Sequence, residues 1–104
     1  MSAIEISLSR YDGPAMINGV EFARVRIGEH AEGGDGWVVR SWDGAAKAAR
    51  SEVPAVNSDW ALLPGPVEVR VPEVGTGRAY IQSVTLDGSL WEIELTGEGP
   101  SPMA

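Results

Sequence analysis

Apolar and polar residues alternate in short runs along most of this 104-residue chain, and a period of two is the pattern of half-buried β-strands. Ile4, Ile6 and Leu8 alternate with Glu and Ser residues, and the segments 67–71 and 90–95 repeat the pattern with Val, Trp, Ile and Leu. We therefore predict a mostly β fold, a small antiparallel β-barrel or sandwich of six to seven short strands.

Two dipeptides, Asn18-Gly19 and Asp87-Gly88, mark tight hairpins between these strands. A type I′ turn requires positive φ at both central residues, which Asn, Asp and Gly tolerate best. In two other places the apolar residues change parity within a run, near Ala23-Arg24 and near Gln82-Ser83. We predict a β-bulge at each, and such bulges let a small sheet curl toward a barrel.

The remaining segments predict turns, loops and at most one short helix. The first strand covers about residues 3–9 and ends at a turn over 11–14, and the glycine-rich segment 28–36 is expected to be a loop. The alanine-rich segment 44–51 is the only credible helix, of at most about two turns, with an ordered loop as the alternative. Residues 53–66 contain three prolines and should be irregular.

The length of the chain fits a single barrel-like domain over residues 1–99, followed by an extended or frayed tail over 100–104. The chain has no cysteine, which excludes disulfides, thiolate metal sites and cysteine nucleophiles. Its N-terminus lacks the pattern of a signal peptide, and no apolar segment approaches the ~20 residues that cross a bilayer. We therefore expect a cytoplasmic protein.

The net charge of −7 argues against two classes of partner. Nucleic-acid binding depends on neutralising phosphates with Lys and Arg, and anionic membranes attract polybasic segments. This chain has fifteen acidic residues against eight basic ones, so we expect neither a nucleic-acid nor a membrane partner.

His30 is the single histidine and lies in the acidic, glycine-rich segment, near Glu29, Glu32 and Asp35. Zinc sites use several His or Cys ligands, and this segment lacks the spacing of a calcium loop. We therefore predict a solvated acidic loop, with no metal, no cofactor and no catalytic site. Acid–base chemistry by His30 with a carboxylate remains the enzyme alternative.

The four tryptophans are the most informative large side chains. Trp91 is expected in the core because it alternates in phase with its apolar neighbours. Trp37 and Trp42 have opposite parity, so one of them should face outward or lie at a barrel rim. Trp60 either plugs the barrel or contributes to an interface. Trp42, Trp60 and Trp37 are the interface candidates, because tryptophan is enriched at binding hot spots.

Five segments of the chain resemble a small, uncharacterised β-rich domain of actinobacteria and their phages, which also occurs attached to flavin-dependent monooxygenases. The resembling segments are 11–15, 18–19, 25–28, 77–80 and 95–100. The resemblance implies a β-barrel-like accessory domain and transfers no functional residue.

We therefore expect a non-catalytic protein-interaction or structural module that binds a protein partner or forms a homo-oligomer. It would be cytoplasmic, or virion-associated if it is phage-encoded. Two alternatives remain open: a barrel that binds a small molecule at its mouth through the tryptophans, and an enzyme that uses His30.

Overall fold

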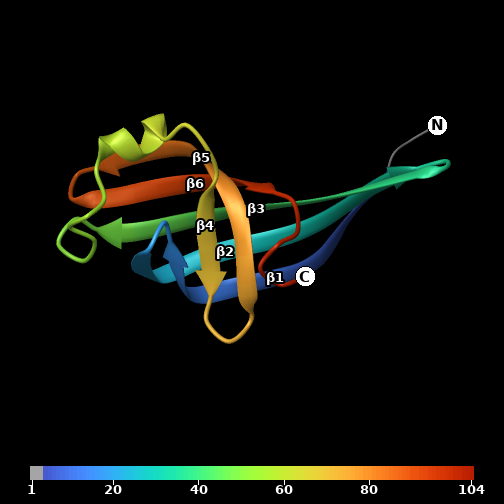
Figure 1. The fold of residues 1–104 in the computed structure, drawn as a ribbon, viewed down its shortest axis with the longest axis horizontal. Coiled ribbons are helices and arrows are strands. Elements are labelled where there is room, and N and C mark those ends of the chain that lie inside the picture. Colours follow the sequence, from blue (N-terminus) through green and yellow to red (C-terminus); the bar gives the residue numbers. More distant parts are fainter. Residues whose placement is uncertain (1–3) are drawn as a thin grey trace.

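Six antiparallel strands and one short 3₁₀ helix make up the fold, as a computed structural model of the chain shows (Figure 1). The structure describes residues 4–104, and strands account for 68% of it, so the mostly β prediction is confirmed. The elements in chain order are β1 (Ile4–Ile17), β2 (Val20–Gly34), β3 (Trp37–Ala49), η1 (Ser58–Leu62), β4 (Val67–Val71), β5 (Gly75–Asp87) and β6 (Leu90–Glu98).

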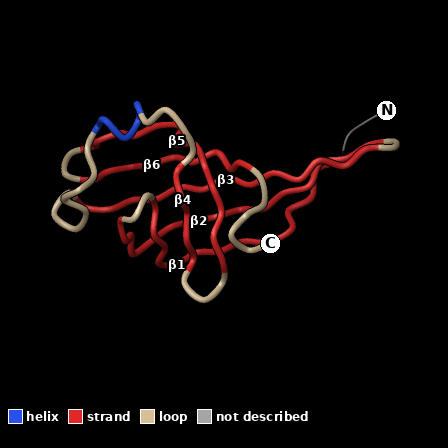
Figure 2. Tube along the Cα trace, viewed as in Figure 1, coloured by secondary structure: helices blue, strands red, loops and turns tan. Residues whose placement is uncertain are grey.

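The strands form one closed ring in the order β1-β2-β3-β6-β5-β4, in which β4 returns to β1 (Figure 2). This confirms the barrel alternative over the sandwich. The seam between β1 and β4 is short, since only Met16–Arg70 and Ile17–Val69 pair across it. The Asn18 amide extends the seam by donating to the Glu68 carbonyl at 2.9 Å.

Both predicted hairpin turns are present. Asn18 and Gly19 have φ values of 52° and 78°, the positive values that a type I′ turn requires. In the second hairpin Asp87 pairs with Leu90, so the two turn residues are 88 and 89 rather than the expected 87 and 88. Gly88 has a φ of 63°.

Both predicted bulges are also present. Between β1 and β2 the register shifts so that Ala23 and Arg24 face the single residue Pro14. On β5, Gln82 is the extra residue of the second bulge, because Ile81 and Ser83 on either side of it pair with consecutive residues of β6. These irregularities bend strands that would otherwise stay straight, and the ring closes as a result.

The predicted turn over 11–14 is wrong, because β1 continues through it to Ile17. The bulge on β2 opposite Pro14 lets this proline stay within the strand. The Tyr11 hydroxyl donates to the Pro14 carbonyl at 2.5 Å. Ala3, with which the predicted first strand began, lies outside the described residues.

The predicted loop over 28–36 is wrong as well. Residues 28–34 continue β2, and only the Asp35-Gly36 turn interrupts the strands, with Gly36 at φ 78°. Here β2 lies between β1 and β3 and pairs with both. Pairing on two edges overrides the weak strand preference of glycine.

The helix considered for residues 44–51 is not formed, because β3 runs through Ala49. Ala46 and Ala48 point into the barrel, where they pair with Ile93 and Trp91 across the β3–β6 ladder. Small side chains at these positions leave room for the large ones opposite. Tertiary pairing therefore outweighs the helix propensity of alanine.

Trp60 closes one end of the barrel. It lies on η1, is 7% exposed, and contacts Phe22 edge to face with ring centroids 6.3 Å apart. The Asn57 side chain caps η1 by accepting from the Asp59 amide at 2.9 Å. The burial of Trp60 agrees with the plug interpretation.

The C-terminal tail packs against β2 and β5, and its burial contradicts fraying, one of the two alternatives expected for it. Ser101 is 5% exposed, and Pro102 is among the fully buried side chains. Pro102 lies directly on Gly77, where an added Cβ would collide with the proline ring. The Trp42 indole donates to the Gly99 carbonyl at 3.1 Å, which fixes the start of the tail.

We predict that Trp60→Ala destabilises the fold by about 3–5 kcal/mol, the usual range for truncating a buried large aromatic side chain. Trp37→Ala is the matched control, because Trp37 is 44% exposed, and it should change stability by at most about 0.5 kcal/mol. Urea unfolding followed by far-UV circular dichroism measures both. Equal effects of the two substitutions would contradict the plug assignment.

Candidate interaction surface

A three-stranded arm projects from the barrel, made of residues 4–10, 28–34 and 37–41 (Figure 1). It extends the molecule to 48 Å along its longest axis, against 27 and 23 Å across. Among the described residues the arm strands pair only with one another, since the β3–β6 ladder begins at Asp43. Both outer edges of the arm are therefore free of strand partners.

One side of the arm, the apolar face, continues the inward side of the barrel strands. Cross-strand partners share a face, and the pairs run from the buried Trp42 outward along β2 and β3. Its members are Ile4, Ile6, Ala31, Gly33, Val38 and Arg40. Ile4 is 65% exposed and Val38 is 72% exposed, so nothing in the described chain covers this face.

The opposite side, the acidic face, carries Glu5 directly across from Glu32, with Val39 and Trp37 beside them on β3. Like charges at facing positions of a β-ladder are destabilising. The two ion pairs within the described residues are His30–Asp43 and Lys47–Glu92, so neither Glu5 nor Glu32 has a cation within 4.0 Å there.

The arm concentrates the exposed apolar surface of the protein. Eleven large hydrophobic side chains are exposed in residues 4–104, and six of them lie on the arm. They are Ile4, Ile6, Leu8, Trp37, Val38 and Val39. Clusters of this kind on a water-exposed element mark interaction sites more often than scattered single residues do.

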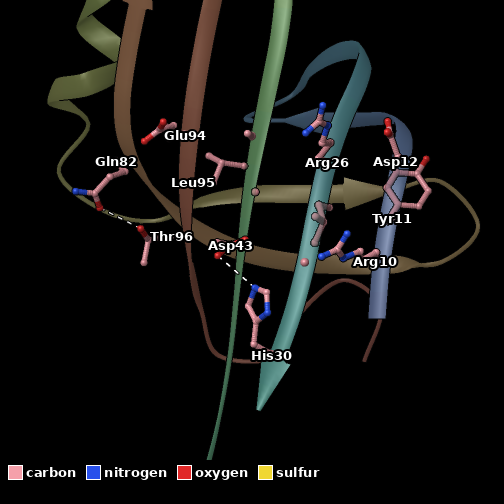
Figure 3. A pocket seen from close by; sticks show the side chains of 14 residues that line it. Arg10, Tyr11, Asp12, Arg26, His30, Asp43, Gln82, Glu94, Leu95 and Thr96 are labelled. Atoms are coloured by element: carbon pink, nitrogen blue, oxygen red, sulfur yellow. Dashed lines mark hydrogen bonds and ion pairs between the residues drawn. The ribbon is translucent and has the colours of Figure 1, made fainter. Parts of the chain in front are cut away.

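An open groove of about 720 Å³ lies beside the base of the arm, on the outer surface of the barrel (Figure 3). His30 of β2 and Asp43 of β3 meet in it, with His30 Nε2 and Asp43 Oδ2 3.3 Å apart. Arg10 and Arg26 also line it, and neither has a carboxylate within 4.0 Å among the described residues. These groups could hold a small polar or anionic ligand.

The groove supplies part of what the enzyme alternative needs. His30 has its carboxylate neighbour, and Ser7 and Ser41 stand opposite His30 on the adjacent strands. No hydroxyl hydrogen bond to His30 is present within residues 4–104, and Asp43 is 66% exposed. An activated nucleophile requires that hydrogen bond and shelter from water, as in serine hydrolases.

A second, smaller cavity of about 440 Å³ lies where the tail meets the base of the arm. Glu29 is 9% exposed there, and its carboxylate accepts from the Ser101 hydroxyl, which in turn accepts from the Met103 amide at 3.2 Å. Burial of a carboxylate is tolerated when a donor replaces its water. Glu29 therefore holds the tail in place.

The structure separates the three tryptophans proposed as interface residues. Trp42 is 3% exposed and Trp60 is 7% exposed, so both belong to the core and cannot contact a partner without rearrangement. Trp37 lies on the arm and is partly exposed, and its indole covers Gly34 near the tip. Trp91 is buried, as predicted.

Sequence reasoning placed Ile4 and Ile6 in an ordinary core strand and missed their exposure. A signal was present in the neighbouring strand, because Ala31 and Gly33, which pair with Ile6 and Ile4, are too small to shield these side chains from the side. The pairing that reveals this depends on β2 extending to Gly34, which the sequence did not predict.

No helix in residues 4–104 is long and apolar enough to span a bilayer. The same residues contain no cluster of three or more His, Asp or Glu side chains arranged to hold a metal ion. Comparison with protein-family models, with curated proteins and with solved structures finds no match to this chain. The resemblance to the actinobacterial domain therefore stays a prediction.

We predict that Ser101→Ala lowers stability by about 1–3 kcal/mol, because it leaves the buried Glu29 carboxylate without its hydroxyl donor. Ser58→Ala is the control, since Ser58 is exposed and makes no side-chain hydrogen bond in the described chain. Chemical denaturation of the two variants measures the difference. A loss no greater than that of the control would contradict the anchoring role of Glu29.

Proposed function

We propose that this chain is a non-catalytic structural or interaction module whose arm binds a second copy of the chain. The observation that carries the proposal is the arm itself, which exposes apolar side chains and unpaired strand edges away from the core. Edges and faces of this kind are the elements that add strands or layers between chains.

The distribution of charge on the arm is compatible with a second copy as the occupant. The chain carries −7 overall, so most contacts between two copies would bring carboxylates together. On the exposed part of the apolar face Arg40 is the single charged residue, and the carboxylates of Glu5 and Glu32 lie on the other side. Two arms can therefore approach without opposing like charges at close range.

The same charge supports the expectation of neither a nucleic-acid nor a membrane partner. A cytoplasmic setting, or a virion if a phage encodes the chain, remains part of the proposal.

We expect the protein to self-associate in solution and Ile6→Lys to weaken that association, because the substitution places a charge among apolar side chains of the arm. Leu62→Lys is the matched control, since Leu62 is 78% exposed on η1, away from the arm. Sedimentation equilibrium over a range of protein concentrations measures the masses. A protein that stays monomeric at every concentration would refute the proposal. So would variants that both self-associate as strongly as the wild type.

A second candidate function is small-molecule binding, and the groove beside the arm is the observation that favours it. Of the tryptophans expected at a barrel mouth, Trp37 lies on the arm and the other three are buried, so support for this candidate moves to groups that line the outer groove, Arg10, Arg26 and His30. A thermal-shift screen with polar and anionic compounds tests it. A true hit should be lost in Arg26→Gln and retained in Arg78→Gln, which lies outside the groove.

A further inference from the structure

Residues 4–7 of β1 form a strand edge that is open to pairing. Within the described chain this segment pairs with β2 alone, because β4 reaches β1 only at Met16 and Ile17. Natural edge strands are protected by lysine, proline or bulges. Residues 4–8 contain no Lys or Pro, and the first register shift between β1 and β2 lies at Leu8, the last residue of this segment.

The segment is self-complementary when it meets a second copy in antiparallel orientation. If Ile6 stands opposite Ile6 of the second copy, Ile4 meets Leu8 and Glu5 meets Ser7. Every apolar residue then faces an apolar one, and each carboxylate faces a hydroxyl that can donate to it. A two-fold axis requires a surface that matches itself in this way.

The other edge of the arm offers a shorter matched segment. Centred on Val38, the β3 edge would pair Val38 with itself and Trp37 with Val39, but the next pair would set Arg40 against Gly36, which lies in the turn before β3. Centred on Val39, it would place Val38 against Arg40 and Trp37 against Ser41. The β1 edge matches over five residues and the β3 edge over three at most, so the sequence favours pairing through β1.

We infer that two copies of the chain join by antiparallel pairing of β1 with β1, with Ile6 on the two-fold axis. The inference rests on the proposed function and specifies which strand makes the contact between the two copies. The two arms then form one continuous six-stranded sheet, with the apolar faces on the same side and the barrels at opposite ends. A pairing of five residues per chain is smaller than the roughly 800 Å² per partner of standard interfaces, so the dimer should be weak.

The charges of the acidic face change surroundings in this dimer. Glu5 stands between Glu32 of its own chain and Ser7 of the second copy, whose neighbour on β2 is His30. A hydroxyl thus lies next to the uncompensated carboxylate pair. Raising the salt concentration screens the remaining repulsion and should strengthen dimerisation.

Because the chain has no cysteine, single cysteines placed on the arm report the register directly. A disulfide needs Cα atoms within about 7 Å. Ile6→Cys meets itself across the axis and should cross-link under mild oxidation. Ile4→Cys alone should not, because its Cα atoms would be roughly 14 Å apart, whereas Ile4→Cys mixed with Leu8→Cys should cross-link. Val38→Cys and Val39→Cys report the two possible registers of the β3 edge.

Lysine substitutions provide a test that does not depend on disulfide geometry. Ile6→Lys opposes two ammonium groups at the axis and should weaken the dimer about tenfold or more. Val38→Lys, on the same apolar face but away from the axis, should leave the dimer unchanged. Because these positions lie off the core, circular dichroism and tryptophan fluorescence should show an intact barrel in both variants.

The outcomes separate the two proposals. Cross-linking through Ile6→Cys and through the Ile4→Cys and Leu8→Cys mixture, together with loss of the dimer in Ile6→Lys alone, supports the register. Cross-linking through Val38→Cys or Val39→Cys, or disruption by Val38→Lys, overturns the β1 pairing and leaves the arm as the contact. A dimer that no arm variant changes, or a monomer throughout, overturns both.

Discussion

The strands around this barrel have unequal lengths, and the rest of the structure follows from that inequality. β2 has fifteen residues, whereas β4 has five, so β2 is about three times as long. A ring can close only where all its strands overlap, so β1, β2 and β3 run past the closed part. Their outer halves form the arm, where they pair with one another and pack against no other layer.

The closed part of the ring is small, and the sizes of its side chains are matched to fill it. Alanines of β3 stand opposite Trp91 and Ile93 of β6, and the Trp42 indole lies on Gly97, where any added Cβ would collide with it. The barrel interior is therefore a packed core rather than a ligand cavity. The side chains that can contact other molecules therefore lie in the outer groove and on the arm.

Local features of this fold were predictable from sequence, and features set by distant partners were not. The Asn18-Gly19 turn and both bulges follow from backbone preferences and parity over a few residues. The helix considered for residues 44–51 and the loop expected for 28–36 failed because pairing with strands remote in sequence decided their conformation. The exposure of Ile4 and Ile6 was missed for the same reason, since alternation shows that a strand has an apolar face without showing whether another layer covers it.

The position of the tail has a consequence for the order in which contacts form. Ser101 and Pro102 are buried against residues of β2 and β5, and Glu29 has no hydroxyl donor until Ser101 reaches it. Glu29 and Ser101 are 72 positions apart in the chain, so their hydrogen bond closes a loop that contains β3, β4, β5 and β6. Contacts between residues so far apart form slowly, because the chain must first lose the entropy of closing the loop. The hairpins of this protein should therefore form before the tail docks.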